Sequence, residues 1–218
     1  MELSNVAIAY IVRYVGDVNI MREDKVNAPY HHGNLRQALL DRAIETLGEK
    51  GVEGLSLRGL ARDLGVSHAA PLRHFATKSD LLNAIAVEGV GSLFAASEAA
   101  DADPQGPARL RAMMLAYINW AKDHSELHHI LRNPDVMRHA SEDLTTLIAS
   151  FAERWRIEIK AAQDTGWRSN VDPDVLFLHI VSLTAGTAIV TTEEVYQRRV
   201  ATPETLSNIE ASIDLFLG

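Results

Sequence analysis

Glycine-ended helical segments constrain the N-terminal half of the chain more than any other feature. Across residues 35–47 the apolar residues recur every three or four positions, which is helical spacing, and Gly51 follows as the expected left-handed end of that helix. Ser56 is a helix-capping residue type at the head of a second, shorter helical segment, and Gly65 ends it. The stretch SHAAPLRHF at 67–75 supplies a third short helix. Two short helices joined by a tight turn with a glycine predict a helix-turn-helix.

The rest of the chain carries helical patterns, with no strand pattern and no internal repeat. Thr77 and Asp80 predict a capping box at the start of a fourth helix. Pro107 and Pro173 stand at first-turn positions that favour a helix start. The fold class is predicted to be all-α, with an N-terminal three-helix helix-turn-helix domain and a C-terminal helical domain. The C-terminal helices are predicted at 107–124, 126–132, 141–162, from 173 onward and from 203 onward.

Charge divides the chain into the same two parts. Residues 22–83 contain nine Lys or Arg and eight Asp or Glu, whereas residues 84–218 contain eleven against nineteen. The net charge of −8 argues against a protein that coats nucleic acid by bulk charge. A near-neutral domain with locally placed cations can still contact phosphates, while the acidic remainder is repelled by them. Two domains with these bounds are therefore predicted.

Residues 1–21 are apolar but fit neither a signal peptide nor a membrane span. The first charged residue is Glu2 rather than a cation, and Arg13 and Asp17 interrupt the apolar run. The segment is predicted to be an N-terminal extension, either strand-like or disordered. The sequence contains no cysteine, which fits a reducing compartment. A cytoplasmic protein that does not enter a membrane is expected.

The motifs from Leu35 to Phe75 and just beyond resemble the DNA-binding domain of the TetR family of transcriptional regulators. The match consists of the glycine-ended first helix, the pattern S-L-R-x-L-A-R-x-L-G-V-S, and the R-H-F-x-x-K-x-x-L-L exit into the next helix. The preceding YHHGNLR and the SHAAP opening resemble one branch of that family. The resemblance implies a homodimeric, all-helical repressor whose C-terminal domain binds a small molecule. It also implies that the last two long helices, near 173–192 and 203–217, form the dimer interface.

The stretch 67–75 is interpreted as the recognition helix. Ser67 is predicted to be its N-cap, which places Pro71 at the third or fourth helical position, where a proline loses at most one hydrogen bond. Phe75 is predicted to be a core residue. The first turn of a recognition helix reaches base edges, and the cations at its far end can face phosphate or guanine. The residues of this segment predicted to contact DNA are Ser67, His68, Ala69, Ala70, Leu72, Arg73 and His74.

Four of these residues also have another interpretation. His68 can be a solvated surface side chain, Arg73 can form a surface salt bridge, and His74 can pack half-buried. Leu72 departs from the family, which usually has a tyrosine here with its hydroxyl on a phosphate. Leucine cannot donate a hydrogen bond, so either Leu72 packs against a thymine methyl or a sugar, or one phosphate contact is missing.

Further phosphate contacts are predicted on both sides of the segment. Lys78 resembles the family's phosphate-contacting lysine at the start of the fourth helix. Ser56 and Arg58, at the start of the second helix, are candidate phosphate contacts as well. Such contacts position a protein on DNA but carry no sequence information. An arm beside the groove, or a free tail, is the interpretation of Tyr30, His31, His32 and Arg36.

The C-terminal domain offers candidates for a ligand pocket, which is typically apolar with a few polar groups. His124 and His128 also have a helical metal-ligand spacing, with His129 and His139 nearby. The sequence contains no cysteine, nucleophile elbow, phosphate loop or HExxH motif, so no catalytic residue, metal or other cofactor is predicted. The ligand candidates, each of which can equally be a core residue, are Trp120, His124, His128, Met137, Trp155 and His179.

These observations lead to one functional hypothesis and two alternatives. The hypothesis is a DNA-binding regulator, a repressor that leaves a palindromic operator when a small apolar ligand binds its C-terminal domain. Its two recognition helices would lie about one DNA turn apart, or a multiple of that distance. The first alternative is a small-molecule binding protein with weakened or lost DNA binding, favoured by Leu72 and the acidic net charge. The second is an all-α enzyme with a metal on the histidine-rich segment 124–139.

Overall fold

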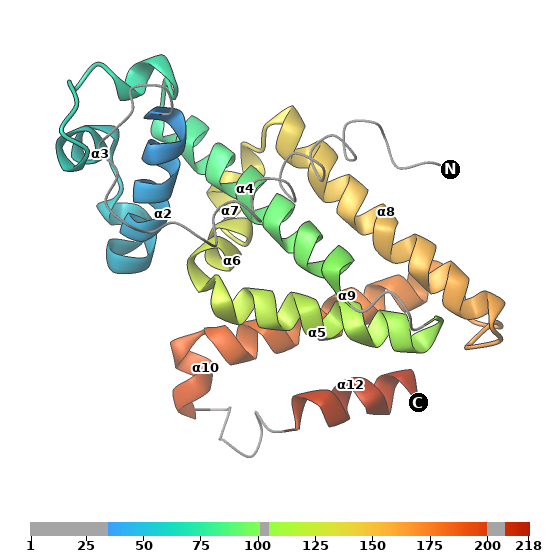
Figure 1. The fold of residues 1–218 in the computed structure, drawn as a ribbon. Coiled ribbons are helices and arrows are strands. Elements are labelled where there is room, and N and C mark those ends of the chain that lie inside the picture. The colour runs from blue at the N-terminus through green and yellow to red at the C-terminus, as the bar shows by residue number, and fades with distance from the viewer. Residues whose placement is uncertain (1–34, 101–104, 200–207) are drawn as a thin grey trace.

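The computed structural model describes residues 35–100, 105–199 and 208–218, and every regular element in these ranges is a helix (Figure 1). The predicted all-α class is confirmed. The predictions for residues 1–21, for Tyr30, His31 and His32, and for the start of the last helix at 203 lie outside the described residues.

The N-terminal elements pack around a small apolar core. Leu39, Leu40 and Leu60 are buried there. Gly51 has a φ of 65°, so the regular part of the first helix ends at the predicted glycine and only one further turn follows. The three elements are α2 (Leu35–Gly54), α3 (Leu57–Asp63) and the 3₁₀ helix η1 (Pro71–Arg73), each in contact with the other two.

Side-chain caps start the next helices where the sequence predicts them. The Ser56 hydroxyl accepts a hydrogen bond from the Gly59 amide at 3.1 Å and caps α3. Thr77 and Asp80 form the predicted capping box of α4 (Lys78–Ala99). Because both caps use residues within one turn of the helix start, they define the helices without help from the rest of the fold.

The remaining helices follow the predicted order. Pro107 and Pro173 occupy first-turn positions, and the Asp172 side chain accepts from the Asp174 amide at 2.8 Å. Two short helices, α7 and α10, were not predicted, because segments of five or six residues hold too few apolar positions to show a period. The helices are α5 (Pro107–Asp123), α6 (Ser125–Leu131), α7 (Pro134–Arg138), α8 (Glu142–Asp164), α9 (Pro173–Thr192), α10 (Glu194–Arg199) and α12 (Ile209–Leu217).

The long helix α4 leads from the N-terminal elements into the centre of the molecule (Figure 1). It contacts α2, α5, α6, α7 and α8, and 12 of its 22 residues are buried. Phe94 is fully buried and packs against Phe151 of α8, with ring centroids 5.4 Å apart. At Gly89 the α4 backbone lies close to α6, since a Cβ there would be 3.6 Å from the Cβ of Leu127. Both halves of the chain therefore share α4.

A buried arginine closes the C-terminal end of α4. Arg109 is 4% exposed, and its guanidinium donates to the carbonyl oxygens of Ala100 at 2.7 Å and Ser97 at 3.3 Å. The last carbonyls of a helix have no partner within the helix, so Arg109 supplies one. Glu158 of α8 lies 3.7 Å from the Arg109 Nε and 2.5 Å from a guanidinium nitrogen of Arg154. Arg109 therefore joins α4, α5 and α8 at one point.

A buried asparagine joins the other end of α4 to the C-terminal helices. The Asn83 amide nitrogen donates to the carbonyls of Ser79 and His139, both at 3.1 Å. The Asn83 Oδ1 accepts from the backbone amide of Ser141 at 2.8 Å. Ser141 is the N-cap of α8, and His139 follows α7. One side chain therefore fixes the α7–α8 junction against the first turns of α4.

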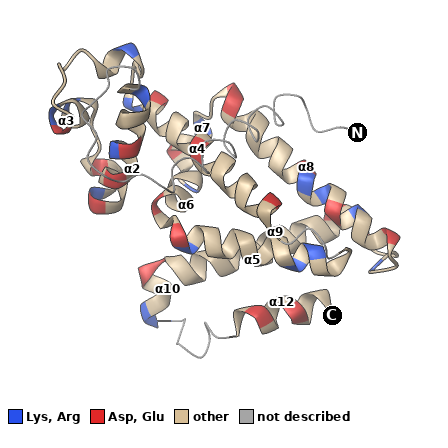
Figure 2. Cartoon of the chain, viewed as in Figure 1, with Lys and Arg blue, Asp and Glu red and all other residues tan. Residues whose placement is uncertain are grey.

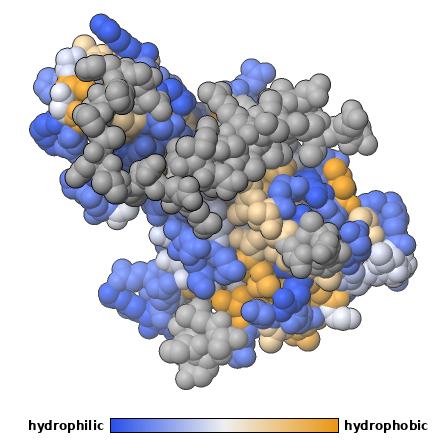
Figure 3. All heavy atoms as spheres, viewed as in Figure 1, coloured by the Kyte–Doolittle hydropathy of each residue, from blue (hydrophilic) through white to orange (hydrophobic). Residues whose placement is uncertain are grey.

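Apolar side chains remain exposed on α9 and α12. Leu176 and Ile180 are buried where α9 packs against α5 and α8, but Leu178 is 64% exposed and Leu215 of α12 is 85% exposed. Figure 3 shows apolar residues gathered over this half of the molecule. By length and composition alone α9 could cross a membrane, a property that core helices of soluble proteins share. The apolar surface on α9 is therefore only partly covered within one copy of the chain.

Candidate functional site

Residues 67–75 form two consecutive tight turns rather than the predicted α-helix. The Ala70 amide donates to the Ser67 carbonyl at 2.9 Å, and the 3₁₀ helix η1 follows directly. The Phe75 amide then donates to the Pro71 carbonyl at 2.9 Å and ends the segment. The predicted helix-turn-helix is therefore present with a 3₁₀ turn in place of its second α-helix.

Pro71 explains this difference. Its predicted place was the third or fourth position of a helix capped by Ser67, but it is the first residue of η1, with Ala70 at the N-cap position. A proline has no N–H, so residue 71 cannot donate to the Ser67 carbonyl and close an α-helical turn. Hydrogen bonds over three residues hold the chain instead, which is typical of short runs.

The segment is anchored by two buried side chains. Pro71 is buried, and Phe75 is 2% exposed, which confirms the prediction that Phe75 is a core residue. The Arg36 guanidinium lies over the Phe75 ring at 5.4 Å from its centroid, so Arg36 packs on the domain. Because η1 contacts both α2 and α3, these anchors fix which side of the segment faces outward.

The outward side carries the residues that the sequence predicts to contact DNA. His74 is exposed, so its interpretation as a half-buried packing residue is wrong. Arg73 is exposed as well, and no carboxylate of the described residues pairs with it. The exposed residues of the segment are Ser67, His68, Ala69, Leu72, Arg73 and His74, while Ala70 is half-buried.

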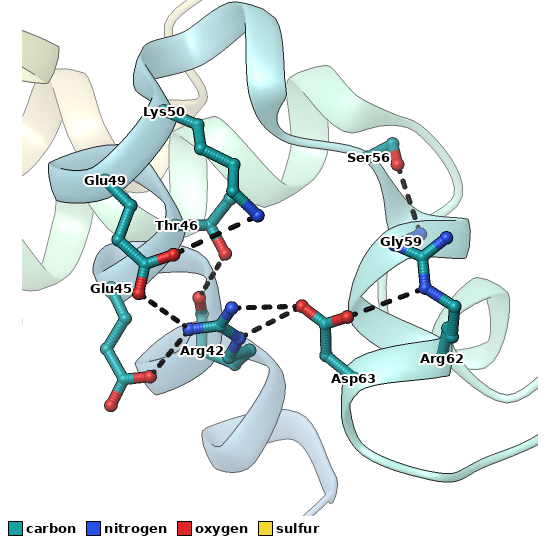
Figure 4. A network of polar contacts seen from close by, with 9 residues as sticks. All are labelled: Arg42, Glu45, Thr46, Glu49, Lys50, Ser56, Gly59, Arg62 and Asp63. Atoms are coloured by element: carbon teal, nitrogen blue, oxygen red, sulfur yellow. Dashed lines mark hydrogen bonds and ion pairs between the residues drawn. The ribbon is translucent and has the colours of Figure 1, made fainter.

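Other cations of the N-terminal domain are neutralised by carboxylates. Arg42 of α2 lies 3.0 Å from Glu45, 3.4 Å from Glu49 and 3.1 Å from Asp63 of α3 (Figure 4). These hydrogen bonds raise the pKa of the Arg42 guanidinium above its ordinary value. Arg62 lies 3.7 Å from Asp63 and extends the network. The network fixes α3 against α2, and its carboxylates neutralise the charges of Arg42 and Arg62. Figure 2 shows the acidic residues of α2 in red.

Arg58, at the start of α3, differs from the arginines of this network and resembles Arg73 in its surroundings. It is exposed and has no ion pair with any residue that the structure describes. Lys78 donates to the Val52 carbonyl at 2.6 Å, so one of its three donors is used inside the domain. The Ser56 hydroxyl accepts a capping hydrogen bond and keeps its proton to donate. At the start of α3, the exposed Arg58 is therefore a cation that no described residue neutralises, on a helix that contacts η1.

Comparison with known proteins places this domain in a family. The sequence profile of the family described as "Bacterial regulatory proteins, tetR family" matches residues 39–85, from α2 to the first turns of α4. The tetracycline repressor protein class D of Escherichia coli is 42% identical over 53 residues. Those residues are 24% of this chain and 24% of that repressor, so the chain matches about a quarter of that relative's length.

Solved structures extend the similarity to nearly the whole chain. A protein of unknown function from Rhodococcus sp. RHA1 is 32% identical with a TM-score of 0.72, covering 88% of this chain and 97% of that one. The TetR family transcriptional regulator PfmR from Thermus thermophilus is 25% identical with a TM-score of 0.63, covering 82% and 96%. This chain belongs to the TetR family. The family consists of DNA-binding transcriptional regulators with a helical C-terminal domain, and not of enzymes.

In this TetR-family chain, three of the predicted ligand residues come together with Tyr117, which the sequence analysis did not select. The rings of Trp120 and His128 are 6.5 Å apart, and His124 lies 5.5 Å from the Trp120 ring. The Tyr117 hydroxyl lies 3.5 Å from the His128 Nε2, and the Trp120 Nε1 donates to the Ser92 hydroxyl at 3.0 Å. Tyr117 precedes Trp120 by three residues on α5, and this spacing could have identified it.

The other three predicted ligand residues lie elsewhere. Trp155 is buried against Phe151, with ring centroids 6.3 Å apart, and Met137 of α7 packs half-buried against the core. His179 is exposed and stacks parallel to Phe216, 6.2 Å between centroids. These two rings line a surface hollow of about 710 Å³ between α9 and α12. The six residues therefore do not form a single pocket.

The structure does not support the metal-enzyme alternative. Among the described residues, no group of three or more His, Asp or Glu side chains could hold a metal ion. The His139 Nδ1 lies 2.9 Å from the Asp135 carbonyl, and the His128 ring faces Tyr117. The histidine-rich segment 124–139 is therefore divided between separate contacts.

Burial decides the charge of His128. Burial first, and then the nearby charge of Arg132, lower the pKa of His128 to about 4. The ordinary pKa of histidine is about 6.5. Burial also raises the pKa of the Tyr117 hydroxyl. At neutral pH the side chains of His128 and Tyr117 are therefore uncharged, which suits a ligand without a strong charge.

The stability of the protein should fall on acidification because of His128. In the unfolded chain His128 binds a proton near pH 6.5, but in the folded protein only near pH 4, so acidification between these values favours unfolding. The expected loss at pH 5, relative to pH 7.5, is about 2 kcal/mol. Urea denaturation at both pH values should show that the His128→Gln variant lacks this loss.

The matched control is His139→Gln, which removes an exposed histidine. Burial raises the pKa of Glu88, so Glu88 also makes stability depend on pH. It is present in the wild type and in both variants, so its effect cancels when their losses are compared. Equal losses on acidification in the wild type and in both variants would contradict the assignment to His128.

Proposed function

We propose that this TetR-family regulator is a cytoplasmic repressor that binds a palindromic operator as a homodimer and is released by a small apolar ligand. The observation that carries the proposal is the outward side of residues 67–74, which is fixed by Pro71 and Phe75 from within. It holds Arg73, which is exposed and has no ion pair with a described residue, and Arg58 lies on α3, which contacts η1. Phosphate contacts require cations of this kind.

In the proposed complex, the residues of the N-terminal domain divide by role. His68, Ala69, Ala70 and Leu72 face base edges, because they lie on the turn that would enter the major groove. Residues at the borders of the segment contact the phosphates and fix the register. This second group comprises Ser56, Arg58, Ser67, Arg73, His74 and Lys78.

The proposed domains are residues 22–83 for DNA binding and residues 84–218 for ligand binding and dimerisation. The exposed apolar side chains of α9 and α12 support a dimer interface there, since apolar patches of this kind mark protein contacts. The ligand would bind beside Trp120, His124 and His128. Met137, Trp155 and His179 lie apart from this cluster, and in the proposal they pack the domain and do not line the same site.

Selection of duplexes from a random DNA library tests the proposal. We expect a palindromic sequence whose affinity falls steeply as the salt concentration rises, because bound phosphates release counterions. Binding of a small apolar molecule to a protein that selects no duplex would instead favour the alternative of lost DNA binding.

The Arg73→Ala variant should bind the selected operator more weakly by about 2 kcal/mol. Its side chain is exposed and pairs with no carboxylate among residues 35–83, so folding should be unaffected. The matched control is Arg62→Ala, which removes an exposed arginine that already pairs with Asp63. Titrations of both variants in one buffer measure the difference, and an unchanged affinity for Arg73→Ala would remove Arg73 from the interface.

A further inference from the structure

Leu72 is the exposed large apolar side chain of the DNA-binding part. Its side chain is 55% exposed, although the two anchors of its own segment, Pro71 and Phe75, are buried. Of the described residues between 35 and 100, Leu72 is the one large hydrophobic residue exposed to this degree. The other such residues lie beyond position 140. Within the part of the chain that the structure describes, the outward leucine is thus a local feature of η1 and not part of a wider apolar surface.

Ala69 is a second exposed apolar residue on the outward side of the segment. It lies inside the turn that the hydrogen bond from the Ala70 amide to the Ser67 carbonyl closes. Leu72 is the middle residue of η1, which follows directly. We call Ala69 and Leu72 the apolar strip. The other exposed side chains of the segment include imidazole and guanidinium groups.

The size and the border of this strip decide what it can contact. Two side chains are far too few for a stable protein interface, which buries about 800 Å² on each partner. The bordering residues His68, Arg73 and His74 favour an anionic partner. DNA offers a small apolar group between two rows of phosphates, the C5-methyl of thymine in the major groove. The methyl is the one apolar feature among the base edges there.

We propose that Leu72, with Ala69 beside it, contacts the methyl group of a thymine at a fixed position in each operator half-site. Leu72 is then a specificity-determining residue and not the remnant of a missing phosphate contact. This inference rests on the proposed function, since it requires operator binding. The inference adds that the base selected by the strip is thymine, and that the selected group is its methyl.

Deoxyuridine substitution tests the contact directly. Deoxyuridine keeps the base pairing and the hydrogen-bonding edge of thymine and removes only the methyl group. Burial of one methyl group is equivalent to about a fourfold change in affinity, so one substitution in each half-site should weaken binding about 16-fold. Each symmetric pair of thymines in the selected operator is replaced in turn by deoxyuridine. Replacement of one such pair is expected to weaken binding.

Three variants assign the effect to Leu72. Leu72→Ala should bind the deoxyuridine operator and the thymine operator with equal affinity. Leu72→Met, which keeps an apolar side chain of similar size, should retain most of the difference. Arg73→Ala should bind both operators more weakly but keep the full ratio. Because Leu72 is exposed, thermal melting should show the three variants folded like the wild type.

The outcomes separate this inference from the proposed function. If the wild type selects no duplex at all, the proposed function fails, and the inference fails with it. If the wild type binds its operator but no thymine pair responds to deoxyuridine, only the inference is overturned. It is also overturned if Leu72→Ala is as sensitive to deoxyuridine as the wild type, since the methyl would then be contacted by another residue.

Discussion

Replacing Arg109 with methionine should lower the free energy of unfolding by about 4 kcal/mol. The Arg109 guanidinium is buried, donates to the carbonyls of Ser97 and Ala100, and lies 3.7 Å from Glu158. Methionine fills much of the same volume but leaves those carbonyls and part of the Glu158 charge without a partner in the interior. Removing one member of a buried ion pair has a cost of this size. Urea denaturation at neutral pH measures it.

The control for this substitution lies two residues along the same helix. Arg111→Met also removes an arginine with two acidic partners, Asp214 at 2.5 Å and Glu210 at 2.8 Å. Those carboxylates are mostly exposed, and exposed ion pairs contribute less than about 1 kcal/mol. Similar losses in the two variants would show that burial is not what makes Arg109 important.

The Asn83→Ala variant should lose about 3 kcal/mol of folding free energy, because it breaks three hydrogen bonds of a side chain that is 8% exposed. The His139 carbonyl and the Ser141 amide lose their bonds to α4, so the α7–α8 junction should also become more mobile. Hydrogen exchange at the Ser141 and Leu144 amides measures that second effect alongside denaturation.

Asn133→Ala provides the comparison for Asn83. The Asn133 side chain accepts from the amides of Asp135 and Val136 and caps the short helix α7, so both of these bonds stay within one turn of the chain. A local cap of this kind is worth about 1 kcal/mol. If Asn83→Ala costs no more than Asn133→Ala, or leaves exchange at Ser141 unchanged, Asn83 does not join the two helices.

The helix starts could be predicted from the sequence because their signals are local. The side chains of Thr77, Ser141 and Asp172 accept hydrogen bonds from amides two or three residues ahead. No distant residue takes part, so the order of residues contains the whole interaction. The same holds for Gly51, whose positive φ ends the first helix.

The type of the recognition segment could not be predicted in the same way. The sequence pattern identified Ser67 to Phe75 as the second element of a helix-turn-helix, and that position is confirmed. It did not reveal that Pro71 would be the first residue of a 3₁₀ helix, because the prediction counted an α-helix from Ser67, whose first turn also tolerates a proline. Hydrogen bonds over three and over four residues are both open to such a short segment, so its pattern alone does not determine the type of turn.

The ligand residues show the limit of helical spacing. Trp120 and His128 lie on either side of His124, where the backbone leaves helical geometry between α5 and α6. His179 has an equally suitable side chain but lies on the far side of α9, beside Phe216. Nothing in the spacing of these residues along the chain distinguishes the two cases.

The burial of α4 on several sides has a consequence for how this protein can change during evolution or be rebuilt. Residue 83 is the last residue of the near-neutral part of the sequence, and the acidic part follows it. The helix α4 continues through this position without a break, and its residues Leu81, Leu82 and Ile85 are buried in the core. A recombination point there would cut α4 after its first turns and separate buried residues that pack together. The C-terminal helices should therefore be exchangeable with those of a relative only together with a matching α4.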